Sequence, residues 1–180
     1  MTLLGISLNG ENVEIVTSVC AVIISTFAFI ASIIFGFSQR KHNRNSVRPI
    51  SAIKVKDYEN YLSVSIQNVG TGPLTISRLW MKEENSDHEY STLIEMMPYI
   101  QRWRTFVERS DGWTIAVGTQ LELLGLEPQN DEDKTAVRKK LSGITVYLNY
   151  TDIYGTKYHD ERKLTFFGRT LQIVHDRNNR

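Results

Sequence analysis

A single uncharged run dominates the hydropathy pattern of the chain. From Ile15 to Ser38 the sequence contains no charged residue and is almost entirely apolar. A helix needs about 20 apolar residues to cross the hydrocarbon core of a bilayer. The run is too long for the apolar region of a cleaved signal peptide, and Arg40 and Lys41 follow it rather than a small-residue cleavage site. It therefore predicts one transmembrane helix over 15–38 that stays in the mature protein.

The charges on the two sides of this run are asymmetric. Glu11 and Glu14 precede it without any Lys or Arg, whereas residues 39–48 are basic and contain no acid. Cations next to a span favour the cytoplasmic side. We therefore expect residues 1–14 to be extracytoplasmic, residues 39–48 to form a linker at the membrane surface, and the remainder to be cytoplasmic. The membrane-surface cations are Arg40, Lys41, Arg44 and Arg48.

Small residues recur within the run at spacings of three and four. They are Ser18, Ala21, Ser25, Ala28 and Ser32, and large apolar residues occupy the other positions. Stripes of small residues let helix backbones approach closely in lipid, and this spacing favours a left-handed crossing. The stripe predicts self-association of the span into a homo-oligomer, although Ser and Ala are common in spans and the spacing could also arise by chance.

After the span, apolar and polar residues alternate in short runs separated by turn signals, which indicates β-strands. The predicted strands are 50–56, 61–68, 74–82, 113–117, 121–124, 144–150 and 157–167. The turns between them include Gly70-Thr71-Gly72-Pro73 and a hairpin turn at 152–156, in which Gly155 supplies the unusual backbone angle. Strands of this kind predict an antiparallel β-sandwich.

Two short helices and one ambiguous run complete the pattern. A helix is predicted over 92–97, capped by Ser91, and another over 132–141. The basic residues of the second helix, Lys134, Arg138 and Lys139, are interpreted as solvated and favoured by the helix dipole. Residues 99–109 are compatible with a strand or a helical turn. The expected fold is thus a transmembrane helix followed by a mainly-β domain over 49–174, with a loose tail at 175–180.

Composition narrows the possible functions. Without the four basic residues after the span and the two acids before it, 17 Lys and Arg face 18 Asp and Glu. This balance argues against a protein that binds long nucleic acid. The only cysteine, Cys20, lies in the span, so no disulfide framework is possible, which agrees with a reducing compartment.

Two motifs carry a resemblance to known proteins. The runs Asn68-Val69-Gly70-Thr71-Gly72-Pro73 and Tyr150-Thr151-Asp152-Ile153-Tyr154-Gly155-Thr156-Lys157-Tyr158 resemble a strand turn and a hairpin of small bacterial proteins with an N-terminal span and a cytoplasmic β-sandwich. The layout is also similar to membrane effectors of type III CRISPR defence, which sense cyclic oligoadenylate. The resemblance implies the bacterial inner membrane as location and a role in antiviral defence, and it supplies no ligand-binding motif.

Catalytic and metal-binding motifs are absent from the sequence. It has no G-x-S-x-G motif and no P-loop, and the four histidines are scattered without a cysteine partner in the β-rich part. His159-Asp160-Glu161 is better explained as an exposed strand end than as an acid–base pair. We therefore expect no enzyme, no cofactor and no metal site.

One concentration of residues favours ligand binding. Arg102, Trp103, Arg104 and Arg109 lie together, with Tyr99 and Phe106 beside them. Guanidinium groups bind phosphates in a bidentate manner and aromatic rings stack on bases. If this run is a strand, Arg102 and Arg104 share a face and Trp103 points into the core. The alternative is an exposed strand whose arginines pair with Glu or lipid headgroups. Trp80 and Trp113 are assigned to the core.

These observations favour an oligomeric membrane sensor or effector that binds a small anionic ligand, such as a cyclic oligonucleotide, and signals to its span. The alternative is a membrane-anchored protein-interaction module without a ligand.

Overall fold

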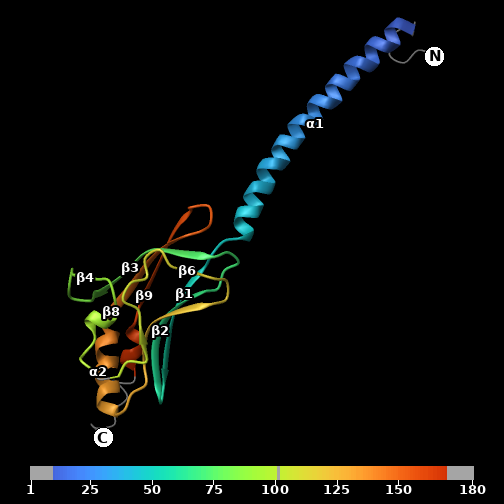
Figure 1. Ribbon diagram of the computed structural model, residues 1–180. Helices are drawn as coiled ribbons and strands as arrows, with labels where there is room; N and C mark the ends of the chain where they lie inside the picture. Colours follow the sequence, from blue (N-terminus) through green and yellow to red (C-terminus); the bar gives the residue numbers. More distant parts are fainter. Residues whose placement is uncertain (1–9, 101, 170–180) are drawn as a thin grey trace. The chain divides into compact units, whose positions relative to one another are not determined.

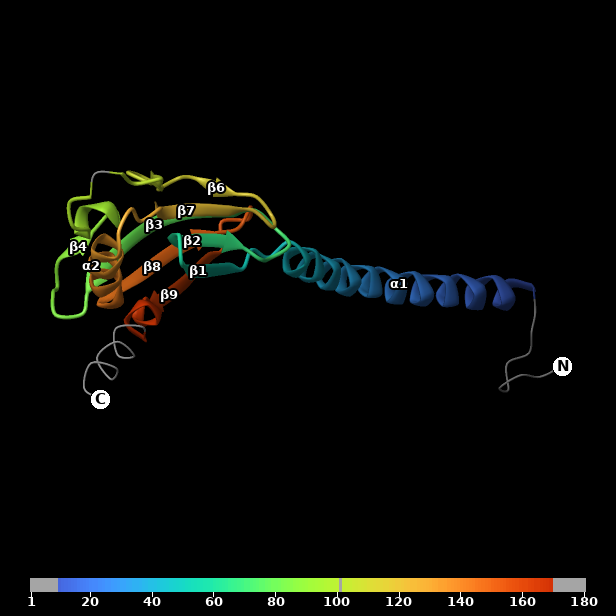
Figure 2. The same cartoon turned by 90° about the horizontal axis from the view of Figure 1, so that it is seen from below.

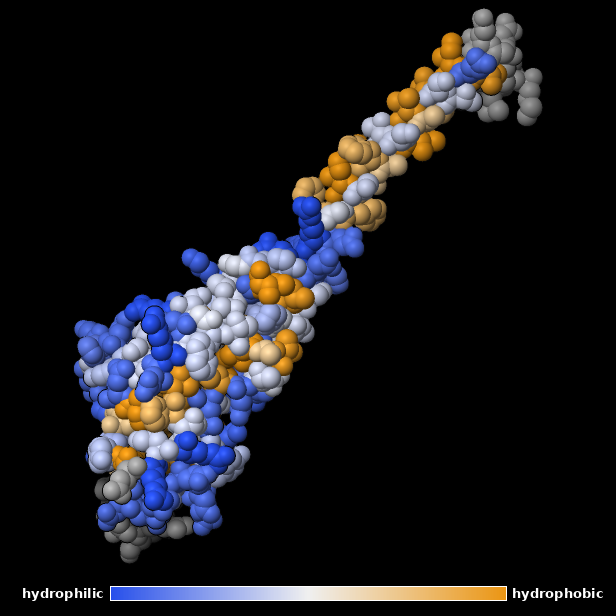
Figure 3. All heavy atoms as spheres, in the orientation of Figure 1, coloured by the Kyte–Doolittle hydropathy of each residue, from blue (hydrophilic) through white to orange (hydrophobic). Residues whose placement is uncertain are grey.

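A long apolar helix forms the first part of the molecule. The computed structural model describes residues 10–100 and 102–169, and the chain divides into two compact units between Asn45 and Ser46. The helix α1 runs from Gly10 to Ser46, and apolar side chains cover most of its surface (Figure 3). Its apolar part is long enough to cross a membrane and is not buried against protein. The helix does not stop at the end of the apolar run, because Arg40, Lys41 and Arg44 lie in its last turns.

The second unit, here called the β-domain and described over 46–169, contains two antiparallel sheets (Figures 1 and 2). Sheet A has the order β1-β2-β7-β5. Its strands are β1 (Ser51–Tyr58), β2 (Tyr61–Asn68), β5 (Thr105–Phe106) and β7 (Gln120–Leu126). Sheet B has the order β4-β3-β8-β9, with β6 paired to β3. Its strands are β3 (Leu74–Glu83), β4 (Glu89–Tyr90), β6 (Thr114–Ile115), β8 (Ile144–Thr151) and β9 (Lys157–Lys163).

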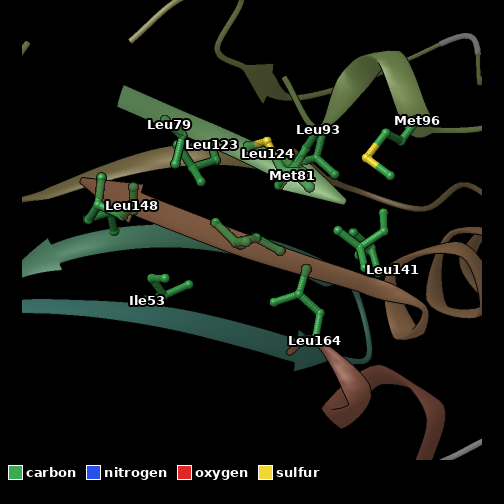
Figure 4. Packing of buried hydrophobic residues seen from close by; sticks show 14 of the residues in the cluster. Ile53, Leu79, Met81, Leu93, Met96, Leu123, Leu124, Leu141, Leu148 and Leu164 are labelled. Carbon is green, nitrogen blue, oxygen red and sulfur yellow. The ribbon is translucent and has the colours of Figure 1, made fainter. Parts of the chain in front are cut away.

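The core lies between the two sheets, as the alternation of apolar residues predicts. Leu62, Val64 and Ile66 of β2 are fully buried, and so are Val146 and Leu148 of β8. Figure 4 shows side chains of both sheets packing together with Leu141 of the helix α2 (Asp131–Ser142), with Met96 of the short helix η1 (Ile94–Met96) and with Leu93, which precedes η1. The expected fold class, an N-terminal helix followed by a mainly-β domain with short helices, is confirmed.

The described part of the β-domain has three short helices, two of them between strands and the third after the last strand. They are η1 (Ile94–Met96), α2 (Asp131–Ser142) and η2 (Thr165–Gly168). Asn130 caps α2 by accepting a hydrogen bond from the Asp133 N–H at 2.7 Å. The Ser91 cap was a wrong prediction, because η1 starts after Leu93 and no side chain caps it. The last predicted strand also ends early, at Lys163, where η2 soon follows.

The basic residues of α2 are not simply solvated, which corrects the sequence interpretation. The Arg138 side chain donates hydrogen bonds to both carboxylate oxygens of Asp57 in β1, at 2.6 to 3.1 Å. Lys134 is buried, with 7% of its surface exposed, and donates to the Glu59 carbonyl at 2.6 Å. These contacts hold α2 on the β1–β2 hairpin.

The turn between β2 and β3 forms a cradle for the segment that follows α1. Asn68 is fully buried and its side chain bonds Gly72 O, Ile115 O and the Gly70 N–H. The Thr71 N–H donates to Arg48 O at 3.0 Å. A Cβ placed on Gly72 would lie 1.8 Å from the Val47 carbonyl oxygen, so only glycine permits this approach. The glycine motif therefore fixes residues 47–50 on the β-domain.

Candidate functional site: an arginine and tryptophan pocket

The segment before β5 lies along the edge of sheet A. Thr105 pairs with Gly125 and Phe106 with Leu124. The Arg104 N–H donates to the Gly125 carbonyl at 3.0 Å. Among residues 99, 100 and 102–109, only Thr105–Phe106 forms a strand, so strand alternation does not place the two arginines on one face. The short ladder to β7 instead fixes where they lie.

One pocket of about 500 Å³ is nevertheless lined by Arg102, Trp103 and Arg104, together with Phe106, Glu127 and Gln129. Glu127 and Gln129 come from the segment after β7. The volume falls in the range of small-molecule sites, about 300–1,000 Å³. The pocket is a concave surface that contains two cations, one carboxylate, one amide and two aromatic rings.

The two arginines differ in their contacts. Arg104 forms an ion pair with Glu127, and its guanidinium carbon lies 5.3 Å from the centre of the Tyr61 ring. Both side chains of the pair are more than half exposed, so the pair contributes at most about 1 kcal/mol. Arg102 is exposed and has no ion-pair partner among residues 10–100 and 102–169. A ligand anion can therefore bind Arg102 directly and can compete with Glu127 for Arg104.

A second carboxylate, that of Glu122, lies on β7, the strand that also carries Gly125. The Tyr61 hydroxyl donates to Glu122 Oε1. Burial raises the pKa of Glu122, and the Lys56 charge opposes this shift. A Cβ on Gly125 would lie 2.7 Å from Glu122 Oε1 and 3.1 Å from the Tyr61 hydroxyl oxygen. Burial therefore disfavours the charged form of this carboxyl.

The remaining residues that the sequence singled out lie elsewhere. Arg109 and Tyr99 are exposed but do not line the pocket. Trp103 is partly buried and packs against the core, although the strand on which this prediction depended does not include it. Trp80 and Trp113 are not core residues: Trp80 stacks on Tyr147 with ring centres 5.3 Å apart, and Trp113 is half exposed. In the described part of the chain, no group of His, Cys, Asp and Glu is arranged to hold a metal ion.

Two serines of the small-residue stripe of α1, Ser18 and Ser25, satisfy their hydroxyls within the helix. Ser18 donates to Glu14 O at 2.8 Å and Ser25 donates to Ala21 O at 2.7 Å. A shallow hollow of about 400 Å³ lies around Ser25, between Val22 and Phe29. At Ser18 and Ser25 the stripe therefore offers a close-packing surface rather than free hydrogen-bond donors.

Sequence reasoning did not identify Glu127 and Gln129, because they reach the pocket through the β5–β7 pairing, which no local sequence pattern indicates.

No curated protein matches the chain. A family model described as a domain of unknown function, DUF8453, matches residues 10–167, which include α1 and nearly all of the described β-domain. The chain belongs to this family, DUF8453.

Proposed function

We propose that the protein is an oligomeric membrane sensor or effector whose β-domain binds a small anionic ligand in the pocket of Arg102, Trp103 and Arg104. The observation that carries the proposal is this pocket, in which two exposed guanidinium groups lie beside aromatic rings. Binding would be transmitted through the β-domain to the span and would perturb the membrane, plausibly in antiviral defence.

The lining favours a phosphate ester that also carries a planar ring. Arginine binds phosphate oxygens through paired N–H groups, and exposed aromatic faces stack on bases. Gln129 adds an amide that can donate and accept hydrogen bonds. A cyclic oligonucleotide combines these features in a small anion, and an oligomer would present one arginine pair from each subunit.

The distribution of charge along the chain supports a cytoplasmic β-domain in an inner membrane. Arg40, Lys41, Arg44 and Arg48 follow the apolar run, and no acid occurs between Glu14 and Asp57. Such an excess of cations favours retention of that side in the cytoplasm. The ligand would then be an intracellular signal.

The alternative function is a membrane-anchored protein-interaction module. Its specific support is the Arg104–Glu127 ion pair, which satisfies one arginine without a ligand. Tyr99 and Phe106, which are exposed on the same segment as the pocket arginines, would then contact a partner protein.

Isothermal titration of the purified chain in detergent, against cyclic di-, tri-, tetra- and hexanucleotides, separates the two functions. We expect one ring size to bind, with a defined oligomer in mass photometry. Loss of a charge-assisted contact costs about 1.5–3 kcal/mol, so Arg102→Ala and Arg104→Ala should each weaken binding about tenfold to a hundredfold.

Arg109→Ala is the matched control, because Arg109 is an exposed arginine of the same segment outside the pocket. It should bind as the unmodified chain does. Absence of binding across the panel would favour the interaction module. Unchanged binding in both pocket variants would refute the site and leave the sensor function standing.

A further inference from the structure

Three turns of the β-domain meet at the end where the chain enters it from α1. The β2–β3 turn, residues 69–73, bonds the entering segment through Val69 N–H to Ile50 O at 2.8 Å. The β6–β7 turn, residues 116–119, lies next to the β2–β3 turn, because the Gly118 N–H donates to the carbonyl oxygen of Asn68, the last residue of β2, at 2.9 Å. In Figures 1 and 2 the orange β8–β9 turn, residues 152–156, lies at this same end. Residues 47–50 and these three turns are here called the three-turn face.

The three-turn face exposes apolar side chains at its tips. Ile50, Val69, Val117, Ile153 and Tyr154 are each between 49% and 59% exposed. Single exposed apolar residues are normal on a protein surface, but here every segment of the face contributes at least one. The face is therefore apolar on all of its projecting turns.

The same face exposes no carboxylate. Its only acidic residue is Asp152, which is 6% exposed and accepts hydrogen bonds from the Tyr154 and Thr156 N–H groups at 2.8 Å. Two cations, Arg48 and Lys157, are exposed on or next to it. Arg48 lies over the Tyr158 ring, with its guanidinium carbon 5.1 Å from the ring centre. The net exposed charge of the face is positive.

The opposite end of the β-domain, unlike the three-turn face, exposes many carboxylates. Residues 83–89 begin with the last residue of β3, and residues 127–133 follow β7, at the ends of these strands away from the three-turn face. They contain eight carboxylates: Glu83, Glu84, Asp87, Glu89, Glu127, Asp131, Glu132 and Asp133. This end thus holds a large share of the acids of the β-domain, and three of them, Glu83, Glu89 and Glu127, form ion pairs there.

We propose that the three-turn face docks on the anionic lipid surface of the bilayer that α1 crosses, an inference that rests on the membrane anchoring in the proposed function. The helical residues between Ser38 and Ser46 span only about 12 Å, so the tether keeps this end close to the headgroups. The apolar tips enter the interface, while Arg48 and Lys157 bind lipid phosphates. Each cation near an anionic leaflet contributes about 1 kcal/mol.

Site-directed fluorescence of the 180-residue chain in nanodiscs tests the docking. Cys20→Ser removes the only native cysteine, and Val117→Cys or Ile153→Cys then carries an environment-sensitive thiol probe. Nanodiscs contain phosphatidylglycerol and a lipid with a spin label near its headgroup. We expect about twofold quenching of both probes, since apolar tips enter the headgroup–acyl boundary by about 5–10 Å. Nanodiscs of zwitterionic lipid should give weaker quenching.

Probes at two further positions, 87 and 37, separate a failure of the docking from a failure of the membrane anchoring. Asp87→Cys places the probe on the exposed acidic end and should not be quenched. Phe37→Cys places it in the apolar part of α1 and should be quenched if the chain is anchored. Quenching at Phe37 without quenching at positions 117 and 153 would overturn the docking alone. Absence of quenching at all four positions would overturn the anchoring and the docking together.

Discussion

At the scale of single residues, Asp152 organises the β8–β9 turn. Its Oδ1 accepts the Tyr154 and Thr156 N–H groups, and its Oδ2 accepts the Tyr158 hydroxyl at 3.2 Å. Gly155 supplies the positive φ of +76° that closes the turn, as its sequence position predicts. Burial raises the pKa of Asp152, but the hydrogen bonds from Thr156, Tyr154 and Tyr158 outweigh burial and lower it overall. The charged carboxylate is thus the form that the folded turn favours.

This carboxylate gives the β-domain a pH-dependent component of stability. A carboxyl with a lowered folded-state pKa stabilises above its ordinary value, here 3.8, and loses this contribution as pH falls through the folded-state value. Asp152→Asn keeps an oxygen for the two backbone N–H groups but cannot titrate. We expect a shallower fall in its free energy of unfolding below about pH 4 than in the unmodified chain. Urea unfolding followed by tryptophan fluorescence measures this.

Asp152→Ala provides the complementary measurement at neutral pH. It removes all three hydrogen bonds and should lower the free energy of unfolding by about 1–3 kcal/mol. Equal pH profiles for the unmodified chain and Asp152→Asn would show that the carboxylate charge does not stabilise the turn.

At the scale of elements, strands with a strict alternation were predicted most accurately. The bounds of β2 match the predicted 61–68, because Leu62, Val64 and Ile66 alternate with polar residues. In β3, Trp80 was assigned to the core from the sequence, whereas the structure buries Leu79 instead. The register shift between Ile76 and Arg78 decides this, since it turns Leu79 inward and Trp80 outward. A bulge of this kind depends on the neighbouring strand and leaves no local signal.

In the candidate site, too, consecutive residues could be identified from the sequence, whereas residues brought together by strand pairing could not. Arg102, Trp103 and Arg104 were found because their chemistry is visible in consecutive residues. Glu127 and Gln129 were missed because only the pairing of β5 with β7 brings them there. The Asp57–Arg138 contact was missed for a similar reason, since 81 residues of chain separate its two partners.

The close approach of Gly72 in the β2–β3 turn to Val47 predicts that residues 47–50 lose their support when Gly72 is replaced. Gly72→Ala would place a Cβ 1.8 Å from Val47 O, so the backbone must move apart. We expect a loss of about 1–3 kcal/mol in the free energy of unfolding, the usual cost of overpacking. Proteolysis between Ser46 and Ile50 should also become faster.

Gly143→Ala is the matched control for this substitution. Gly143 has an ordinary φ of −94°, and a Cβ there would lie 3.9 Å from Lys140 O. Its free energy of unfolding should change by less than about 0.5 kcal/mol. A Gly72→Ala variant as stable and as resistant to proteolysis as Gly143→Ala would refute the cradle.

At the scale of the whole molecule, β7 connects the two surfaces that the proposals use. Its first residue, Gln120, follows the turn 116–119 of the three-turn face, and its last residue, Leu126, precedes Glu127 of the pocket. β2 runs beside β7 along this length, from Leu62 opposite Leu126 to Gln67 opposite Gln120. A ligand that competes with Glu127 for Arg104 would therefore act on the strand that reaches the lipid-facing end.

Signalling to the membrane also requires that the spans associate, and the small-residue stripe of α1 predicts where they meet. Ser25→Leu and Ala28→Leu add bulk to the stripe, and we expect each to weaken self-association about threefold or more. Ala28→Leu removes no hydroxyl, so it separates packing from the bond between Ser25 and Ala21 O. Ile24→Leu, a swap of equal volume off the stripe, is the control. Förster transfer between labelled chains in liposomes, measured against the lipid-to-protein ratio, reports association. Transfer that stays at the control level in both stripe variants would place the contact on another face of the helix, or show that the spans do not associate.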